Sequence, residues 1–146
     1  MKVVVERVVK SPVQRVFWFT ADGENAPKWI ESIYEARRVA GQLGKGSRVY
    51  YRAEVAGSEF EFITEAIEWE PLRRFRDIMV EKLRGPLREY SLEGLYEQLS
   101  PRKTRVKLIL EFQLDMPQPA KAILEKLIAY KLRRSLMDSL RKLDRL

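Results

Sequence analysis

The sequence predicts an α+β fold in which a curved antiparallel sheet of about seven strands is wrapped around one long C-terminal helix. Strand-like runs separated by short turn signals fill residues 32–114. Short connections join antiparallel strands, because parallel pairing needs long crossovers. Several of these runs alternate apolar and polar residues, which indicates a sheet with one apolar face. The helical pattern over residues 118–145 is the only element large enough to cover that face.

The N-terminal part predicts one strand followed by two short helices. β-Branched residues alternate weakly over residues 2–9, which is typical of a strand. Ser11 as the N-cap, Pro12 at the first helical position and Gln14 three residues after the cap then predict a helix start. A second short helix is expected over residues 24–30.

Trp18 lies off the apolar face of the first predicted helix. Val13, Val16 and Phe17 recur at helical spacing and should pack on the sheet, whereas Trp18 points in roughly the opposite direction. We expect Trp18 either to seal the second short helix or to stay exposed as an anchor for a partner or a membrane surface.

The middle of the chain predicts six consecutive strands. Glycine and proline turn signals separate the expected strands 32–40, 47–56, 58–70, 73–83, 87–99 and 103–114. Alternation is clearest in the last of them, where one face carries Val106, Leu108, Leu110, Phe112 and Leu114. These strands should therefore share one apolar face and one solvent face.

The predicted C-terminal helix has an apolar stripe and a basic side. The stripe consists of Ala120, Ile123, Leu124, Leu127, Ile128, Leu132, Leu136, Leu140 and Leu143. From residue 117 to residue 146 there are eight Lys or Arg residues against three acids, a local excess of five out of the total +7. Nucleic acid or an anionic surface could bind there, through Lys131, Arg133, Arg134, Arg141 and Lys142.

The same charge excess has a second interpretation. Glu occurs 16 times and Arg 17 times, whereas Asn occurs once. This composition is typical of a protein from a hot environment, where surface ion-pair networks become more favourable and labile amides are avoided.

The chain contains no cysteine and no histidine, which excludes several classes of chemistry. Disulfides, thiolate nucleophiles, zinc fingers, Ser-His-Asp triads and histidine-ligated metals are ruled out. Carboxylate pairs such as Glu59 with Glu61 fall on predicted strands, where charged residues are expected on the solvent face. We therefore predict no catalytic residue, no metal site and no cofactor.

Length and hydropathy predict one cytoplasmic domain over residues 1–146. A chain of 146 residues is long enough to bury a proper core. Met1 leads directly into the first strand, so no signal peptide is expected. No apolar run approaches the roughly 18 residues that a membrane-spanning helix needs.

Five motifs follow one another in an order that is typical of one superfamily. They are SPVQRVFWFTAD (11–22), ENAPKW (24–29), LGKGSRV (43–49), EWEP (68–71) and SPRKTRV (100–106). Together with the element order they resemble the helix-grip superfamily, also called SRPBCC, of START-like domains, polyketide cyclase/dehydratase-like proteins and birch-pollen-allergen-type proteins. The resemblance covers essentially the whole chain. It implies a cavity between the sheet and the C-terminal helix, and it carries over no catalytic residue.

Six aromatic side chains are candidates to line that cavity and bind a ligand: Trp29, Tyr51, Phe60, Phe62, Phe75 and Tyr90. Their alternative role is to fill the core. Tyr51 and Tyr90 are the stronger candidates, because a buried hydroxyl needs a polar partner that a ligand could supply.

Three functions follow as hypotheses. The first is non-catalytic binding or transport of a hydrophobic small molecule, such as a lipid, a quinone or a polyketide-like compound. The second is a polyketide cyclase or dehydratase that uses Tyr and carboxylate groups in the cavity. The third is docking of the basic helix on RNA, a ribosome or an anionic membrane, because some members of the superfamily are similar to ribosome-associated toxins.

Overall fold

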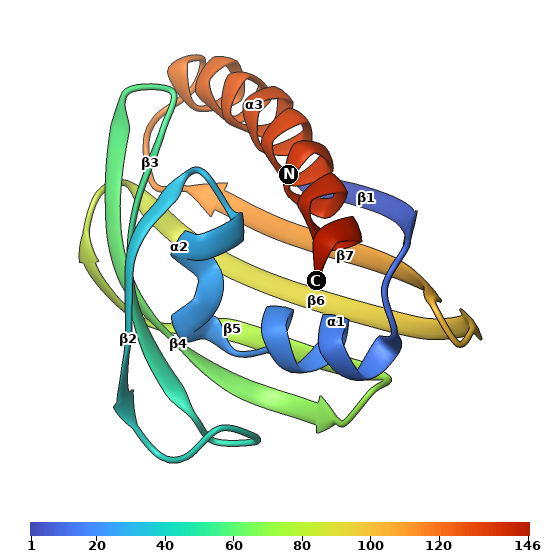
Figure 1. Ribbon diagram of the computed structural model, residues 1–146. Helices are drawn as coiled ribbons and strands as arrows, with labels where there is room; N and C mark the ends of the chain where they lie inside the picture. The colour runs from blue at the N-terminus through green and yellow to red at the C-terminus, as the bar shows by residue number, and fades with distance from the viewer.

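The computed structural model describes residues 1–146 and contains one seven-stranded antiparallel sheet in the order β1-β7-β6-β5-β4-β3-β2 (Figure 1). Every predicted strand is present, and each predicted boundary lies within one residue of the observed one. The strands are β1 (Lys2–Val9), β2 (Ile33–Ala40), β3 (Arg48–Val55), β4 (Ser58–Glu70), β5 (Arg74–Arg84), β6 (Leu87–Ser100) and β7 (Lys103–Leu114).

The first strand lies at the opposite edge of the sheet from the second. β1 pairs antiparallel with β7, with Val5 opposite Leu108, so that the first and the last strand of the chain lie side by side. The segment between β1 and β2 must therefore cross the sheet. It does so as two short helices on the concave side, next to the long helix α3 (Ala120–Lys142) (Figure 1).

The first helix, α1 (Val13–Thr20), starts later than the sequence predicts. Pro12 takes the N-cap position with extended φ and ψ of −64° and 146°, and Ser11 caps nothing. The fully buried Ser11 hydroxyl instead donates to the carbonyl oxygen of Leu143 at 2.6 Å. The carbonyls at the end of a helix need donors, and Ser11 provides one for the C-terminus of the chain.

The second predicted helix, over residues 24–30, is divided into two shorter turns. A 3₁₀ turn, η1 (Gly23–Asn25), leads into α2 (Ala26–Trp29). Pro27 stands in the first turn of α2. Proline lacks an N–H group and is tolerated only in the first turn of a helix. A new helix, α2, therefore starts at Ala26, directly before Pro27.

The long helix α3 covers the sheet with a narrower face than the predicted stripe. Ile128, Leu136 and Leu140 are buried, whereas Ile123 is 68% exposed and Leu127 is 43% exposed. Ala120 is also exposed. The predicted stripe was wrong at these three positions, because a single helix on a concave sheet contacts it along a strip only.

A buried acid replaces apolar contact near the start of α3. The Glu125 carboxylate accepts the backbone N–H of Leu114 at 2.9 Å. This bond joins α3 to the end of β7.

No helix is both long and apolar enough to cross a bilayer.

Candidate functional site

An apolar cavity lies between the concave face of the sheet and α3. Its volume is about 60 Å3, and all but one of its 16 lining residues are hydrophobic. They come from the α2–β2 connection, the sheet and α3: Ile30, Ser32, Ile33, Ala53, Val55, Phe60, Phe62, Leu87, Tyr90, Leu92, Leu110, Phe112, Leu114, Ile128, Leu132 and Leu136. We call this space the apolar chamber.

The apolar chamber is small in this conformation. Ligand sites for drug-sized molecules typically measure about 300 to 1,000 Å3, whereas this chamber measures about 60 Å3. It holds only a few non-hydrogen atoms as it stands. The helix α3 contributes Ile128, Leu132 and Leu136 to its wall.

A second, smaller cavity adjoins the first beneath α1 and α2. Its volume is about 20 Å3, and it shares Ile30, Ile33, Tyr90 and Leu92 with the apolar chamber. Its lining is mixed, because polar residues join the apolar ones: Thr20, Tyr51, Thr64, Asp77 and Tyr90. We call this space the polar chamber.

The six predicted aromatic residues are divided between the two chambers. Phe60, Phe62 and Tyr90 line the apolar chamber. Trp29, Tyr51 and Phe75 line the polar chamber, and Tyr90 borders both. The structure therefore places all six around two adjoining cavities, and their role in binding a ligand stays a prediction.

Asp77 is the residue that the sequence interpretation missed. It lies on β5, two residues after the buried Phe75 and on the same face of the sheet, and it lines the polar chamber. Burial raises the pKa of the Asp77 carboxyl group to about 7, and no ion pair or hydrogen bond offsets this effect. The Asp77 side chain is only partly exposed, and its carboxyl group has no hydrogen-bond or ion-pair partner in the protein.

The signal for Asp77 in the sequence was ambiguous. The run Phe75-Arg76-Asp77-Ile78-Met79 has apolar residues on both faces of an alternating strand. Either face could have been the inner one. Only the pairing of Phe75 with Gly94 on β6 fixes which face points inward, because a Cβ atom on Gly94 would lie 2.3 Å from the Phe75 ring.

Two phenols stand near the Asp77 carboxyl group. Burial raises the pKa of both Tyr51 and Tyr90, and the negative charge of Asp77 raises it further, so both phenols stay protonated. The Tyr51 hydroxyl also lies against Gly23, where an added Cβ atom would come within 2.1 Å of the hydroxyl oxygen. Because Gly23 has no side chain, the Tyr51 hydroxyl can occupy this position.

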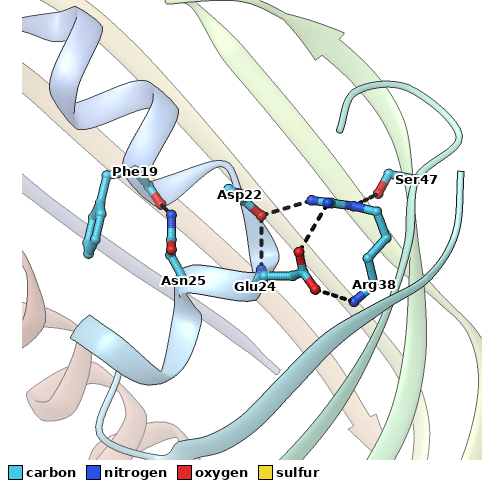
Figure 2. A network of polar contacts seen from close by, with 6 residues as sticks. All are labelled: Phe19, Asp22, Glu24, Asn25, Arg38 and Ser47. Carbon is cyan, nitrogen blue, oxygen red and sulfur yellow. Dashed lines mark hydrogen bonds and ion pairs between the residues drawn. The ribbon is translucent and has the colours of Figure 1, made fainter. Parts of the chain in front are cut away.

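The segment that covers the polar chamber is fastened to β2 by Arg38. Figure 2 shows its guanidinium between Asp22, at 2.9 Å, and Glu24, at 3.1 Å, with Ser47 accepting a third bond at 3.1 Å. The backbone N–H of Arg38 donates to Glu24 as well, at 2.8 Å. Asn25 donates to the carbonyl oxygen of Phe19 and closes the same turn (Figure 2).

The surface candidates lie outside this interior. Trp18 is 44% exposed, and its ring packs against Phe17 and Trp69. The basic residues proposed for a nucleic acid or an anionic surface are all exposed on α3: Lys131, Arg133, Arg134, Arg141 and Lys142. Among them only Arg141 forms an ion pair, with Asp138 at 2.9 Å.

Comparison with known proteins assigns this chain to a protein family. The family model "Polyketide cyclase / dehydrase and lipid transport" matches residues 1–146. A search of curated proteins finds no match.

Solved structures share the fold over nearly the full length at low identity. A protein from Thermus thermophilus has 22% identity and a TM-score of 0.80, with 99% of this chain and 95% of that chain covered. The Zhui aromatase/cyclase from Streptomyces sp. R1128 has 18% identity and a TM-score of 0.80, with coverage of 99% and 94%. A START superfamily protein from Mycobacterium smegmatis has 18% identity and a TM-score of 0.78, with coverage of 97% and 94%.

Proposed function

Since the chain belongs to the polyketide cyclase/dehydrase and lipid-transport family, we propose that it binds a hydrophobic small molecule between the sheet and α3. The observation that supports this proposal most is the lining of the apolar chamber, in which 15 of the 16 residues are hydrophobic. A lipid, a quinone or a polyketide-like compound has the apolar surface that such a lining accepts.

Burial of apolar surface would provide the affinity. At roughly 25 cal/mol per Å2, covering about 300 Å2 of ligand surface contributes on the order of 7 kcal/mol. The cost of immobilising the ligand reduces this gain by several kcal/mol. What remains corresponds to weak to moderate binding, as expected for a protein that must also release its ligand.

Binding requires the interior to open. Leu132 and Leu136 on α3 face Ile33 and Val55 across the apolar chamber, so α3 forms its movable wall. On the opposite side the cover formed by η1 and α2 is held by Arg38. We propose that α3 moves outward as a unit to admit the ligand while the sheet stays fixed.

A cavity-filling variant tests this function. Ala53 is buried and lines the apolar chamber, so Ala53→Leu should occupy the space and weaken binding of apolar probes at least about tenfold. Ala40→Leu makes the same chemical change at an exposed position of β2 and should leave binding unchanged. The measurement is calorimetric titration with a panel of lipids and quinones. Equal binding by the wild type and both variants would contradict the proposal.

One observation favours a second candidate, an enzyme of the cyclase or dehydratase type. Asp77 is an unpaired interior carboxyl group beside the Tyr51 and Tyr90 phenols, and such groups can act as general acids or bases. If the protein turns over a substrate, Asp77→Asn should reduce kcat by at least about a hundredfold. Full turnover with Tyr51→Phe and Tyr90→Phe combined would argue against this candidate.

A further inference from the structure

The polar side chains that line the interior lie mostly at one end of it, in the polar chamber. Apart from the Tyr90 phenol, which borders both chambers, the apolar chamber has one polar residue, Ser32, whereas the polar chamber also has Tyr51, Thr64 and Asp77. A molecule that fills both chambers would therefore meet apolar walls along its body and hydrogen-bonding groups at its tip.

Hydrogen-bonding capacity at that tip is unused by the protein. The Asp77 carboxyl group has no ion pair or hydrogen bond, and the buried indole N–H of Trp29 has no partner. Arg38, the basic residue nearest this region, lines a third small cavity together with Asp77, but its bonds go to Asp22 and Glu24. Buried polar groups are normally satisfied, so unsatisfied ones call for an explanation.

Not every polar group at the tip is free. The Thr20 hydroxyl donates to the Val16 carbonyl oxygen and shares a hydrogen bond with the Tyr96 phenol. The groups left for a ligand are Asp77, Tyr90 and the Tyr51 phenol, which also hydrogen-bonds to Thr64. They face the space from β5, β6 and β3 respectively.

The size of the polar chamber limits what can enter it. A water-sized group needs about 10 to 15 Å3 of such space, and the chamber offers about 20 Å3. One oxygen atom with its hydrogen fits. A carboxylate or a phosphate does not fit, and its charge would be repelled by the Asp77 carboxylate.

The remaining groups also distinguish a hydroxyl from an ammonium ion. An ammonium ion could pair with the Asp77 carboxylate, but burying its charge in an otherwise apolar interior costs far more than burying a neutral hydroxyl group. A hydroxyl group both donates and accepts. It can donate to Asp77 while it accepts from Tyr51 or Tyr90, so that both kinds of partner are satisfied.

We infer that the polar chamber recognises a single hydroxyl group, and that the ligand is an uncharged alcohol or phenol whose apolar body fills the apolar chamber. This inference rests on the proposed function and specifies its ligand class. It excludes molecules that would place a free carboxylate or a phosphate at the inner end.

Four probes of one shape test the inference by calorimetric or NMR titration at pH 8. They are p-xylene, p-cresol, 4-methylbenzoate and 4-methylbenzylamine, which carry a methyl, hydroxyl, carboxylate or ammonium-bearing group on the same ring. We expect p-cresol to bind about tenfold more tightly than p-xylene, as one hydrogen bond to a charged group provides. The benzoate should bind more weakly than p-xylene.

Substitution of Asp77 should change this order. With Asp77→Asn, the advantage of p-cresol over p-xylene should fall below about threefold, and the benzoate should gain affinity because the repelling charge is gone. Asp138→Asn makes the same change on the surface of α3, where Asp138 is exposed, and should preserve the wild-type order. Tyr51→Phe and Tyr90→Phe provide independent variants if Asp77→Asn fails to fold, and each should reduce the preference for p-cresol.

The outcomes separate the inference from the function on which it rests. Equal binding of p-xylene and p-cresol would overturn the hydroxyl site and leave the apolar chamber as a binding site. Tightest binding of the benzoate or of the benzylamine would also overturn it, in favour of an anion or a cation site. If neither p-xylene nor p-cresol binds, the proposed function itself fails for ligands of this size.

Discussion

At the scale of single residues, the interior is arranged around Asp77 and the groups packed next to it. Burial of a carboxyl group without a partner costs stability, and the fold tolerates this cost at the centre of β5. Gly23 and Gly94 show how closely the neighbours are fitted, because an added Cβ atom would lie 2.1 Å from Tyr51 and 2.3 Å from Phe75 respectively. These contacts place two aromatic rings beside the carboxyl group.

Stability should depend on pH through Asp77. Its pKa is about 7 in the folded protein against 3.8 for the free group. Between these values the folded state binds a proton that the unfolded state lacks, so the free energy of unfolding should fall as pH rises from about 4 to about 7. Tyr51, Tyr90 and Tyr96 stay uncharged here, because burial raises the pKa of each phenol.

The variant Asp77→Asn isolates this effect. We expect it to be more stable than the wild type by about 2 to 4 kcal/mol at pH 8 and nearly equal to it at pH 4. Urea unfolding at both pH values measures the difference. A variant that is less stable than the wild type at pH 8 would show that the carboxylate has a stabilising partner.

A double-mutant cycle tests the contact between Gly23 and Tyr51. Gly23→Ala should destabilise the protein by about 1 to 3 kcal/mol, because the new methyl group overlaps the Tyr51 hydroxyl oxygen. Tyr51→Phe removes that oxygen, so the pair Gly23→Ala with Tyr51→Phe should recover most of the loss. Additive effects of the two substitutions in thermal or urea unfolding would disprove the contact.

At the scale of elements, the cover made of η1 and α2 depends on one side chain. Arg38 joins Asp22, Glu24 and Ser47, and its own side chain is only 21% exposed. The side-chain hydrogen bonds between the cover and β2 all involve Arg38, so the cover can loosen when this side chain is lost. Looser packing here would ease access to the polar chamber.

Replacement of Arg38 by Met should loosen the cover selectively. We expect a loss of about 1 kcal/mol in global stability and clearly faster hydrogen exchange of the amides in residues 22–30. Arg48→Met removes a single, more exposed ion pair with Glu65 and should change both quantities less. Unchanged exchange in residues 22–30 would mean that packing alone holds the cover.

The elements themselves were largely predictable from the sequence, for physical reasons that differ along the chain. Strand boundaries follow from alternation and turn residues, which are local properties. The start of α1 was misplaced because the Ser11 hydroxyl bonds to Leu143, far along the chain. Asp77 was missed because both faces of β5 carry apolar residues, and only its neighbours in the sheet decide which face is buried.

At the scale of the whole molecule, positive charge is concentrated on the outer side of α3. Most ion pairs join strands of the sheet, whereas Lys131, Arg133, Arg134 and Lys142 have no acidic partner. The exposed Ile123 and the exposed Tyr130 lie on the same helix. An ion-pair network therefore does not account for the charge of this helix.

This charge should attract anionic surfaces in a salt-dependent manner. We expect the protein to sediment with vesicles that contain phosphatidylserine at about 20 mM salt and to be released at about 500 mM salt, because the Debye length shrinks several-fold over that range. Gln in place of Arg133 and Arg134 should weaken the binding. Equal binding to zwitterionic vesicles, or binding that salt leaves unchanged, would contradict this prediction.

Native mass spectrometry of the purified protein measures most directly whether the interior between the sheet and α3 holds an apolar molecule. The account predicts a population heavier than the bare chain by the mass of one uncharged hydrophobic compound, and Ala53→Leu should abolish that population. A bare mass in both proteins, together with no response to the lipid and quinone panel, would contradict it.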